Sequence, residues 1–282
     1  MISGKNAIIT GASVGLGREI AMTFVKNGAN VCICAREGSE LKNVTRLLNE
    51  NKKFDDQIIT CKETDIAYTN EVDSLFEYSE KIFGNIDVFV NNAGIYGPIG
   101  PIETNDWDSW EYACRVNFLG MIYFVRKSIS HMKKNGRGGK IICLSGGGAT
   151  KPMPNFSSYA ATKAAVVRAA ETFAIETRDF DIDINCLAPG ALNTRLLDEA
   201  LSVGKDILGE KKYAQLIEQK ESGGASLKNA ANCALFLASE KSNGITGRLI
   251  SAVWDDWKSF PENWHKWADT DYFTLRRFVP SE

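Results

Sequence analysis

Short apolar runs alternate with longer helix-like stretches along almost the whole sequence, and this alternation is the feature that most limits the possible folds. Short, continuously apolar runs are typical of parallel strands that helices cover on both faces. The expected strands are Ala7–Thr10, Asn30–Ala35, Ile58–Lys62, Ile86–Val90, Lys140–Leu144, Asp183–Leu187 and Gly247–Val253. The expected helices are Gly17–Asn27, Glu40–Asn51, Asn70–Phe83, Asp108–Asn135, Tyr159–Asp179 and Lys228–Ser239. The sequence therefore predicts an α/β fold, with a doubly wound parallel sheet of about seven strands.

The 282 residues are enough for one large α/β domain, and no internal repeat or low-complexity linker divides them. We therefore expect a single catalytic domain over residues 1–253. Within it, residues 191–227 are polar and punctuated by glycines, and they follow the end of an expected strand. Such an insertion is typical of a lid over a substrate site. Residues 254–282 form a carboxyl-terminal extension.

The composition argues against several kinds of partner. The net charge is -2 and no basic block stands out, so nucleic acid is not expected. No apolar run approaches the ~20 residues that span a bilayer, and the first residues lack the apolar core of a signal peptide. The seven cysteines show no paired spacing, and His131 and His265 lie far apart. We expect a cytoplasmic protein with reduced cysteines, no metal site and no membrane partner.

A glycine-rich turn separates the first expected strand from the first expected helix. Its sequence, TGASVGLGREIA, spaces three glycines as G-x-x-x-G-x-G. Glycines allow a sharp turn and a close backbone approach, and the start of a helix directs free N–H groups at an anion. The turn therefore predicts a cradle for the phosphates of a dinucleotide, although a purely structural turn is the alternative. The cofactor contacts expected from this turn are Gly11, Ser13, Gly15, Leu16 and Gly17.

The end of the second expected strand distinguishes the two nicotinamide cofactors. An acidic residue there would bind the ribose 2′-hydroxyl of NAD(H). This strand ends with Arg36, whose guanidinium is suited to the 2′-phosphate of NADP(H). The adjacent Glu37 favours NAD(H), and a solvated surface arginine is the structural alternative. We therefore predict that NADP(H) is preferred and that NAD(H) is possible.

Tyr159 and Lys163 lie four residues apart and share one face of an expected helix. A lysine ammonium near a phenol favours the phenolate, so we expect the pKa of Tyr159 to be lowered. Such a phenol can exchange a proton with a carbonyl oxygen. The same spacing occurs at Tyr123 and Lys127, but that pair follows no strand or loop. Tyr159 follows a strand and a glycine loop, which places it at the carboxyl ends of the strands.

Taken together in chain order, these motifs resemble the short-chain dehydrogenase/reductase family, single-domain type, from about Lys5 to Val253. The matching residues are Thr10-Gly11-x-x-x-Gly15-x-Gly17, Asp65, Asn91-Asn92-Ala93-Gly94, Asn117, Tyr159-x-x-x-Lys163 and Pro189-Gly190-x-x-x-Thr194. The resemblance implies a Rossmann-like fold and an NAD(P)-dependent oxidoreductase. It also implies a homodimer or a homotetramer.

The resemblance assigns roles to individual residues. Asn117 would hold a water that relays protons to Lys163, while Tyr159 and Lys163 would act at the reacting carbonyl. The implied cofactor contacts are Asp65 and Ile66 at the adenine, Asn91, Ala93 and Gly94 at the adenosine ribose, Lys163 at the nicotinamide ribose, and Pro189, Gly190 and Thr194 at the carboxamide, with Tyr159 as a further cofactor contact. Asn91, Ala93 and Gly94 would also steady the centre of the sheet. Each also has a structural interpretation, such as a helix cap for Asp65 or an ordinary turn at Pro189.

The sequence departs from the family at the serine that orients the substrate. The family places this serine thirteen residues before the tyrosine, where this chain has Gly146. Ser145 is one residue early, and successive residues of a strand point to opposite faces. Either the glycine-rich loop lets the Ser145 hydroxyl reach the substrate, or a backbone N–H or water replaces it. We predict Ser145 as the fourth catalytic residue, beside Asn117, Tyr159 and Lys163.

The extension is rich in tryptophan. Four of the six tryptophans, Trp254, Trp257, Trp264 and Trp267, lie within it, and two aspartates separate the first pair. Aromatic rings beside carboxylates suit a sugar ring, whereas packing against the domain or a neighbouring subunit is the alternative. The SGGGA loop and this extension resemble a subset of the family associated with polysaccharide and sugar metabolism.

We therefore expect an NADPH-dependent carbonyl reductase that acts on a ketone or alcohol, with a sugar or nucleotide-sugar derivative as the expected substrate. A 3-oxoacyl or small-ketone reductase is the alternative among enzymes. A nucleotide-binding sensor or scaffold without turnover is the alternative of another class, and only the displaced serine supports it.

Overall fold

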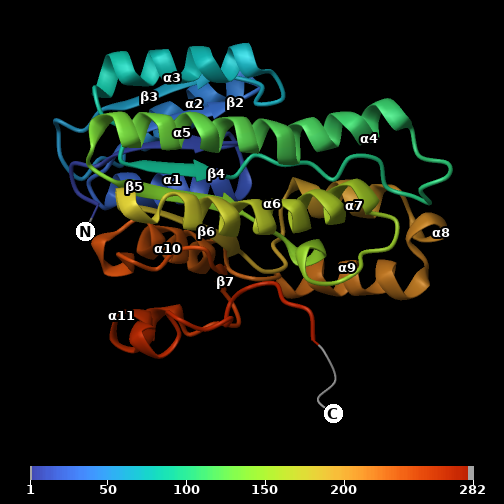
Figure 1. Cartoon of the computed structure of the whole chain (residues 1–282). Coiled ribbons are helices and arrows are strands. Elements are labelled where there is room, and N and C mark those ends of the chain that lie inside the picture. Colours follow the sequence, from blue (N-terminus) through green and yellow to red (C-terminus); the bar gives the residue numbers. More distant parts are fainter. Residues whose placement is uncertain (1, 279–282) are drawn as a thin grey trace.

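The computed structural model describes residues 2–278 and contains one parallel sheet of seven strands in the order β3-β2-β1-β4-β5-β6-β7 (Figure 1). The strands are β1 (Asn6–Thr10), β2 (Asn30–Ala35), β3 (Ile59–Glu63), β4 (Val88–Asn91), β5 (Gly139–Leu144), β6 (Ile182–Ala188) and β7 (Leu249–Ser251). The strand order reverses direction between β1 and β4, which is the doubly wound arrangement. The predicted α/β fold is therefore confirmed.

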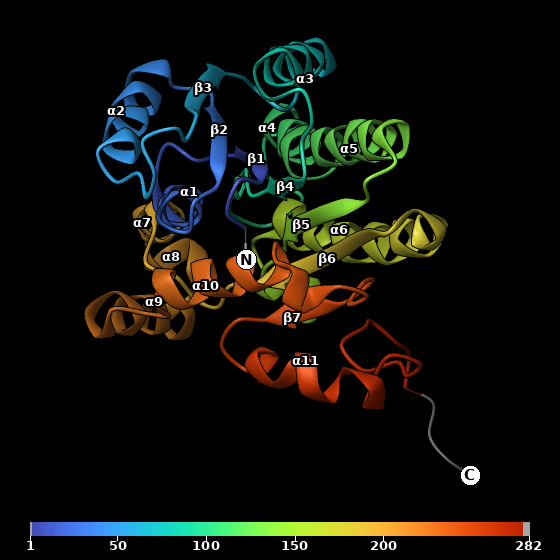
Figure 2. The same cartoon turned by 90° about the vertical axis from the view of Figure 1, so that its left-hand side faces the viewer.

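Helices cover both faces of the sheet, as Figure 2 shows from the side. One face carries α1 (Gly15–Lys26), α2 (Gly38–Asn49) and α10 (Leu227–Leu237), and the other carries α3 (Thr69–Phe83), α4 (Trp107–Cys114), α5 (Met121–Asn135) and α6 (Ser157–Glu176). Alternate strand residues feed the two hydrophobic cores: in β1, Ile9 belongs to one core and Ile8 to the other. A continuously apolar strand therefore contributes side chains to the hydrophobic cores on both faces of the sheet.

The long helix expected over Asp108–Asn135 has a π-helical segment, Arg115–Gly120, between α4 and α5. A Cβ added to Gly120 would lie 2.1 Å from the Ile66 carbonyl oxygen, so the chain passes very close to the loop after β3. Such wide turns within helices often occur at functional sites. Here the segment contains Asn117, which is buried.

The segment 191–227 folds into three helices, α7 (Arg195–Ser202), α8 (Lys205–Leu208) and α9 (Glu210–Ser222). Figure 1 shows them at the end of the molecule toward which the β4 arrow points. A separate apolar cluster holds them together and contains Phe156, Leu197, Ala200, Leu208 and Leu216. These helices therefore cover the carboxyl ends of the strands, where the sequence places the site.

The extension packs against the body of the same chain. It contains the helical turn Trp257–Ser259, then α11 (Phe260–Asn263) and the turn Trp264–Lys266. Trp257 and Phe260 are 7% and 1% exposed, and both contact the ring of Phe236 from α10. These side chains complete the core on that face. Within residues 2–278, no helix has the length and apolar character needed to cross a membrane.

Candidate functional site

A cavity of about 860 Å³ lies at the carboxyl ends of the strands. Its wall is built from the turn after β1, the ends of β2 and β5, the loops after β4 and β6, and the helices α7 and α9. The sequence-predicted residues that line it are Gly11, Ser13, Gly15, Leu16, Arg36, Asp65, Ile66, Ala93, Gly94, Ser145, Tyr159, Lys163, Pro189, Gly190 and Thr194. Over residues 2–278, no group of His, Cys, Asp or Glu side chains is placed to hold a metal ion.

The turn between β1 and α1 is packed so tightly that two of its glycines, Gly11 and Gly17, leave no room for a side chain. Gly11 has a φ of +62°, and a Cβ there would lie 2.7 Å from the Ala93 Cα. A Cβ on Gly17 would lie 2.4 Å from the Gly11 carbonyl oxygen. The N-cap of α1, Val14, offers no side-chain hydrogen bond, and the first turn has no acidic residue. The free N–H groups of α1 therefore face the cavity, as phosphate binding requires.

Two predicted cofactor contacts lie behind the wall. Gly17 is buried in the turn. Asn91 is buried in the sheet, where its side-chain amide donates to the Met121 carbonyl at 3.2 Å. The Asn91 side chain therefore points toward α5 at the centre of the sheet and not into the cavity, and its contact with the adenosine ribose stays a prediction. The neighbouring Asn92 lines the cavity, and its amide donates to the Thr10 and Gly11 carbonyls at 3.0 Å each.

Arg36 and Asp65 are joined through a tyrosine that the sequence analysis did not single out. The Tyr112 hydroxyl donates to Asp65 Oδ2 at 2.6 Å, and Arg36 Nη1 donates to the same hydroxyl at 3.0 Å. The other Asp65 oxygen accepts from the Ala67 N–H. Asp65 is not a helix cap, because α3 begins after Tyr68. Arg36 therefore has a fixed position at the cavity wall.

Tyr159 and Lys163 come from the first turns of α6, beside the end of β5. Lys163 Nζ donates to the Leu144 carbonyl at 2.8 Å and lies 5.6 Å from the centre of the Tyr159 ring. Burial lowers the pKa of Lys163 to about 8 and raises the pKa of Tyr159. The predicted lowering of the tyrosine pKa is therefore wrong in this structure, because loss of hydration outweighs any effect of the ammonium.

Asn117 lies behind the reacting groups and does not line the cavity. Its Oδ1 accepts from the Ile95 N–H at 2.9 Å, and its Nδ2 donates to the Ile95 carbonyl at 2.8 Å. A Cβ on Gly94 would lie 3.2 Å from Asn117 Oδ1 and 3.4 Å from Lys163 Nζ, so the three residues are neighbours. The side chain fixes the loop after β4, while a role in proton relay stays a prediction.

Ser145 and Gly146, the two candidates for the serine position, have different surroundings. The Ser145 hydroxyl is buried at the cavity wall and has no hydrogen-bond partner among residues 2–278. A Cβ on Gly146 would lie 2.2 Å from Tyr159 Oη, so the phenol occupies the space where a side chain would stand. An unpaired buried hydroxyl costs free energy unless a ligand pairs with it. Of the two positions, only Ser145 thus carries an unpaired hydroxyl at the cavity wall, and its catalytic role stays a prediction.

We expect Gly146→Ala to reduce kcat about 100-fold, because the added methyl displaces the Tyr159 hydroxyl by an ångström or more. Gly147→Ala is the matched control, since no atom of residues 2–278 outside its chain neighbours lies within 4 Å of a Cβ at that position. Steady-state kinetics of the two variants would check this. Equal activity of the two variants would contradict the close approach of Gly146 and Tyr159.

The sequence analysis missed most of the wall opposite the glycine turn. Side chains that line it are Tyr96, Met153, Phe156, Leu197, Ala200 and Leu216. The Tyr96 ring meets the Tyr159 ring edge-on, with centroids 4.8 Å apart. Leu197, Ala200 and Leu216 lie in the segment 191–227 that the sequence predicts as a lid. The other three residues come from loops and the start of α6 without a regular apolar period, so no sequence signal marked them individually. The cavity wall around Tyr159 is therefore largely apolar.

Known proteins with the same architecture match almost the whole chain. The family model for short chain dehydrogenases matches residues 5–202. 3beta-Hydroxysteroid dehydrogenase 1 of Eggerthella lenta is 31% identical over 250 residues, which cover 88% of this chain and 92% of that protein. Glucose 1-dehydrogenase of Gluconobacter oxydans is 32% identical over 248 residues, covering 88% and 90%. The crystal structure of 3-ketoacyl-(acyl-carrier-protein) reductase from Brucella melitensis complexed with NADH has a TM-score of 0.76 and 29% identity, covering 89% and 97%.

Proposed function

This chain belongs to the short-chain dehydrogenase family, and on that basis we propose that it is an NADPH-dependent carbonyl reductase. The family places it among oxidoreductases that act on CH–OH and C=O groups. The observation that carries the proposal is one cavity that combines the uncapped start of α1 with the side chains of Ser145, Tyr159 and Lys163.

Each reacting side chain has one task in the proposed reduction. The nicotinamide, when bound, supplies the hydride that reaches the carbonyl carbon. Tyr159 donates its phenolic proton to the carbonyl oxygen, and burial favours the protonated phenol that this step needs. The Lys163 ammonium then stabilises the phenolate that remains. The unpaired Ser145 hydroxyl donates a hydrogen bond to the substrate oxygen.

The charges at the end of β2 support NADP(H) as the preferred cofactor. Arg36 lines the cavity and is positioned by Tyr112. Glu37, which would favour NAD(H), lies 3.7 Å from the Arg195 guanidinium across the cavity mouth. That ion pair offsets the negative charge next to Arg36. A 2′-phosphate at the end of β2 would therefore meet the Arg36 guanidinium, which supports the proposed preference.

We expect Arg36→Ala to weaken NADPH binding about tenfold or more, because the 2′-phosphate loses a charge-assisted hydrogen bond. NADH binding should change less than about threefold, since NADH carries no 2′-phosphate. Fluorescence titration with each cofactor measures both constants. Arg46→Ala, an exposed arginine outside the cavity, is the matched control. Tighter binding of NADH than of NADPH by the unaltered protein would contradict the proposed preference.

The substrate we propose is a ketone on a sugar or related ring. Trp254 and Asp255 line the cavity, and a glucose 1-dehydrogenase is among the similar proteins. The apolar wall around Tyr96 favours a second candidate, a 3-oxoacyl or small ketone, and a 3-ketoacyl reductase shares the fold. Consumption of NADPH with a panel of keto-sugars, 3-oxoacyl thioesters and simple ketones separates the two.

We also propose a cytoplasmic homo-oligomer. All seven cysteines are unpaired, which suits a reducing compartment. Leu119 and Ile175 are 57% and 66% exposed, which suits a contact with a second subunit. Light scattering coupled to size-exclusion chromatography measures the oligomeric state.

A further inference from the structure

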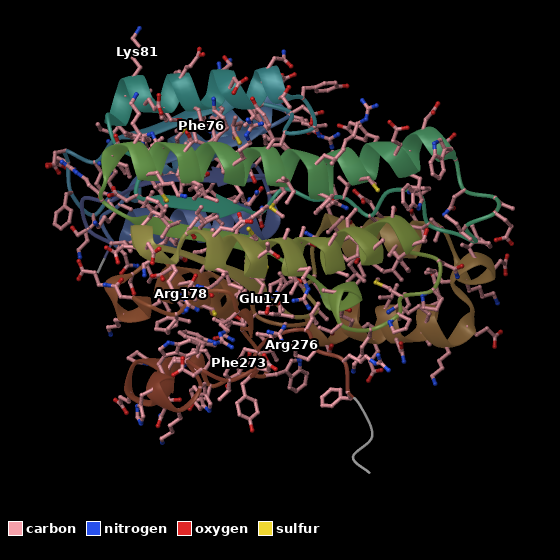
Figure 3. All side chains as sticks on the ribbon, in the orientation of Figure 1. Phe76, Lys81, Glu171, Arg178, Phe273 and Arg276 are labelled. Carbon is pink, nitrogen blue, oxygen red and sulfur yellow. The ribbon has the colours of Figure 1, made fainter. Side chains whose placement is uncertain are left out.

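The carboxyl-terminal segment returns from α11 to the cavity and forms part of its wall. Phe273, Thr274 and Leu275 line the cavity, as do Trp254 and Asp255 just after β7. Figure 3 shows Arg276 beside Glu171 of α6, which lies more than a hundred residues earlier in the sequence. We call the five cavity-lining residues Trp254, Asp255, Phe273, Thr274 and Leu275 the tail wall.

A set of ion pairs holds the tail wall in place. Arg276 Nη2 lies 2.6 Å from Glu171 Oε1, and Glu171 is only 9% exposed. Arg168, also of α6, pairs with the other Glu171 oxygen and donates to the Leu275 carbonyl at 2.6 Å. Since Glu171 is almost fully buried, its carboxylate needs partners, and each of its two oxygens pairs with one of these guanidiniums. The segment is thus fixed to the helix that carries Tyr159.

Backbone contacts fix the same segment to the edge of the sheet. The Leu249 N–H of β7 donates to the Phe273 carbonyl at 2.7 Å. The Arg248 guanidinium donates to the carbonyls of Ala268, Thr270 and Tyr272. Multiple hydrogen bonds to one side chain restrict the backbone strongly. The tail wall is therefore a rigid part of the site.

Trp254 differs from the other tryptophans of the extension. Trp257 is buried, and Trp264 and Trp267 pack on Phe260, whereas Trp254 is 85% exposed. Its predecessor Val253 contacts the Gly190 position, since a Cβ there would lie 2.6 Å from Val253 Cγ2. Trp254 therefore presents a free indole next to the loop after β6, close to the expected carboxamide site.

Asp255 beside it has an oxygen available for a ligand. Asp255 Oδ2 accepts from the Ser251 N–H at 2.7 Å, and within residues 2–278 no protein hydrogen bond is made to Oδ1. Partial burial raises the pKa of this carboxyl. Thr274 adds a hydroxyl to the same wall; it donates to the Asp271 carbonyl and retains its acceptor lone pairs.

We infer that the tail wall is the substrate-recognition surface and that it selects a ring ketone carrying additional hydroxyl groups. The indole of Trp254 stacks on the ring, and Asp255 accepts a hydrogen bond from a ring hydroxyl. The apolar wall around Tyr96 contacts the other side of the ring. This inference rests on the proposed reductase function and defines the substrate class for it.

A matched pair of substrates isolates the role of the ring hydroxyls. Cyclohexanone and a pentahydroxycyclohexanone (an inosose) share the ring and the carbonyl and differ only in hydroxyl groups. We expect kcat/KM to be at least about tenfold higher for the inosose. Trp254→Ala and Asp255→Asn should each lower kcat/KM for the inosose about tenfold and change that for cyclohexanone less than about twofold. Trp107→Ala, an exposed tryptophan outside the cavity, should change neither.

The ion pairs are tested separately from the contact residues. Arg276→Ala should raise KM for the inosose severalfold without changing NADPH binding, because it loosens the segment and leaves the cofactor wall intact. Arg277→Ala is the matched control, since this exposed neighbour lies outside the cavity and makes no ion pair within residues 2–278. Equal effects of the two variants would contradict the role of the Glu171 pair.

The outcomes separate this inference from the proposed function. Failure to bind NADPH, or to reduce any carbonyl of the panel, would overturn the reductase proposal itself. Turnover with equal preference for the two ring ketones, or with none for the inosose, would leave the reductase standing and overturn the role of the tail wall. Calorimetric titration of the NADPH complex of Tyr159→Phe with the inosose measures binding without turnover, and Trp254→Ala should weaken that binding as well.

Discussion

Tyr159→Phe is expected to reduce kcat about 1,000-fold while the protein still folds and still binds NADPH. Proton transfer from a positioned side chain contributes roughly 10² to 10⁴ in rate, and phenylalanine keeps the ring but removes the proton. Within residues 2–278 the Tyr159 hydroxyl makes no hydrogen bond to the protein, so its loss leaves no internal group unpaired. Stopped-flow measurement of NADPH oxidation gives the rate, and thermal unfolding gives the stability.

Tyr123→Phe is the control that the sequence itself supplies, because Tyr123 and Lys127 repeat the same spacing. The Tyr123 hydroxyl donates to Asp73 at 2.9 Å, away from the cavity. This variant should keep kcat within about twofold of the unaltered protein. If Tyr159→Phe retained a tenth or more of the normal kcat, another group would have to be the proton donor.

Lys163→Met is expected to reduce kcat about 100- to 1,000-fold and at the same time to stabilise the folded protein near neutral pH. Burial holds the pKa of Lys163 at about 8, against an ordinary value of 10.5. At pH 7 the folded protein therefore bears the cost of a charged, buried ammonium, on the order of 3 kcal/mol. Methionine fills a similar volume without a charge and removes that cost.

The pH dependence of stability distinguishes this cause from ordinary repacking. Between pH 8 and 10.5 the unfolded chain holds the Lys163 proton and the folded chain has released it. The free energy of unfolding of the unaltered protein should therefore rise through this window relative to that of Lys163→Met, and the gap between them should close. Urea unfolding of both proteins at pH 7, 9 and 10.5 measures it. If the difference in free energy of unfolding between the two proteins stayed constant with pH, burial would not destabilise the charged form of Lys163.

The sequence by itself determined the sheet, the order of its elements and most of the cofactor wall. Strand β2 spans Asn30–Ala35 as expected, because a parallel strand buried on both faces is a continuous apolar run. The glycine turn could be predicted because the tight backbone packing at Gly11 and Gly17 requires glycine, so the residue type and its spacing indicate the turn. Tyr159 and Lys163 could be paired because residues four apart share a helix face.

Only the tertiary structure decided what surrounds these groups. Asn91 has the expected type and position, yet the direction of its side chain from β4 places it against α5 instead of in the cavity. The pKa of Tyr159 depends on burial by segments distant in the sequence, and spacing to Lys163 does not report burial. The tail wall is held in place by the ion pair of Arg276 with Glu171, two residues that lie more than a hundred positions apart in the sequence. Local sequence patterns record local geometry, whereas desolvation and long-range ion pairs arise only when the chain is folded.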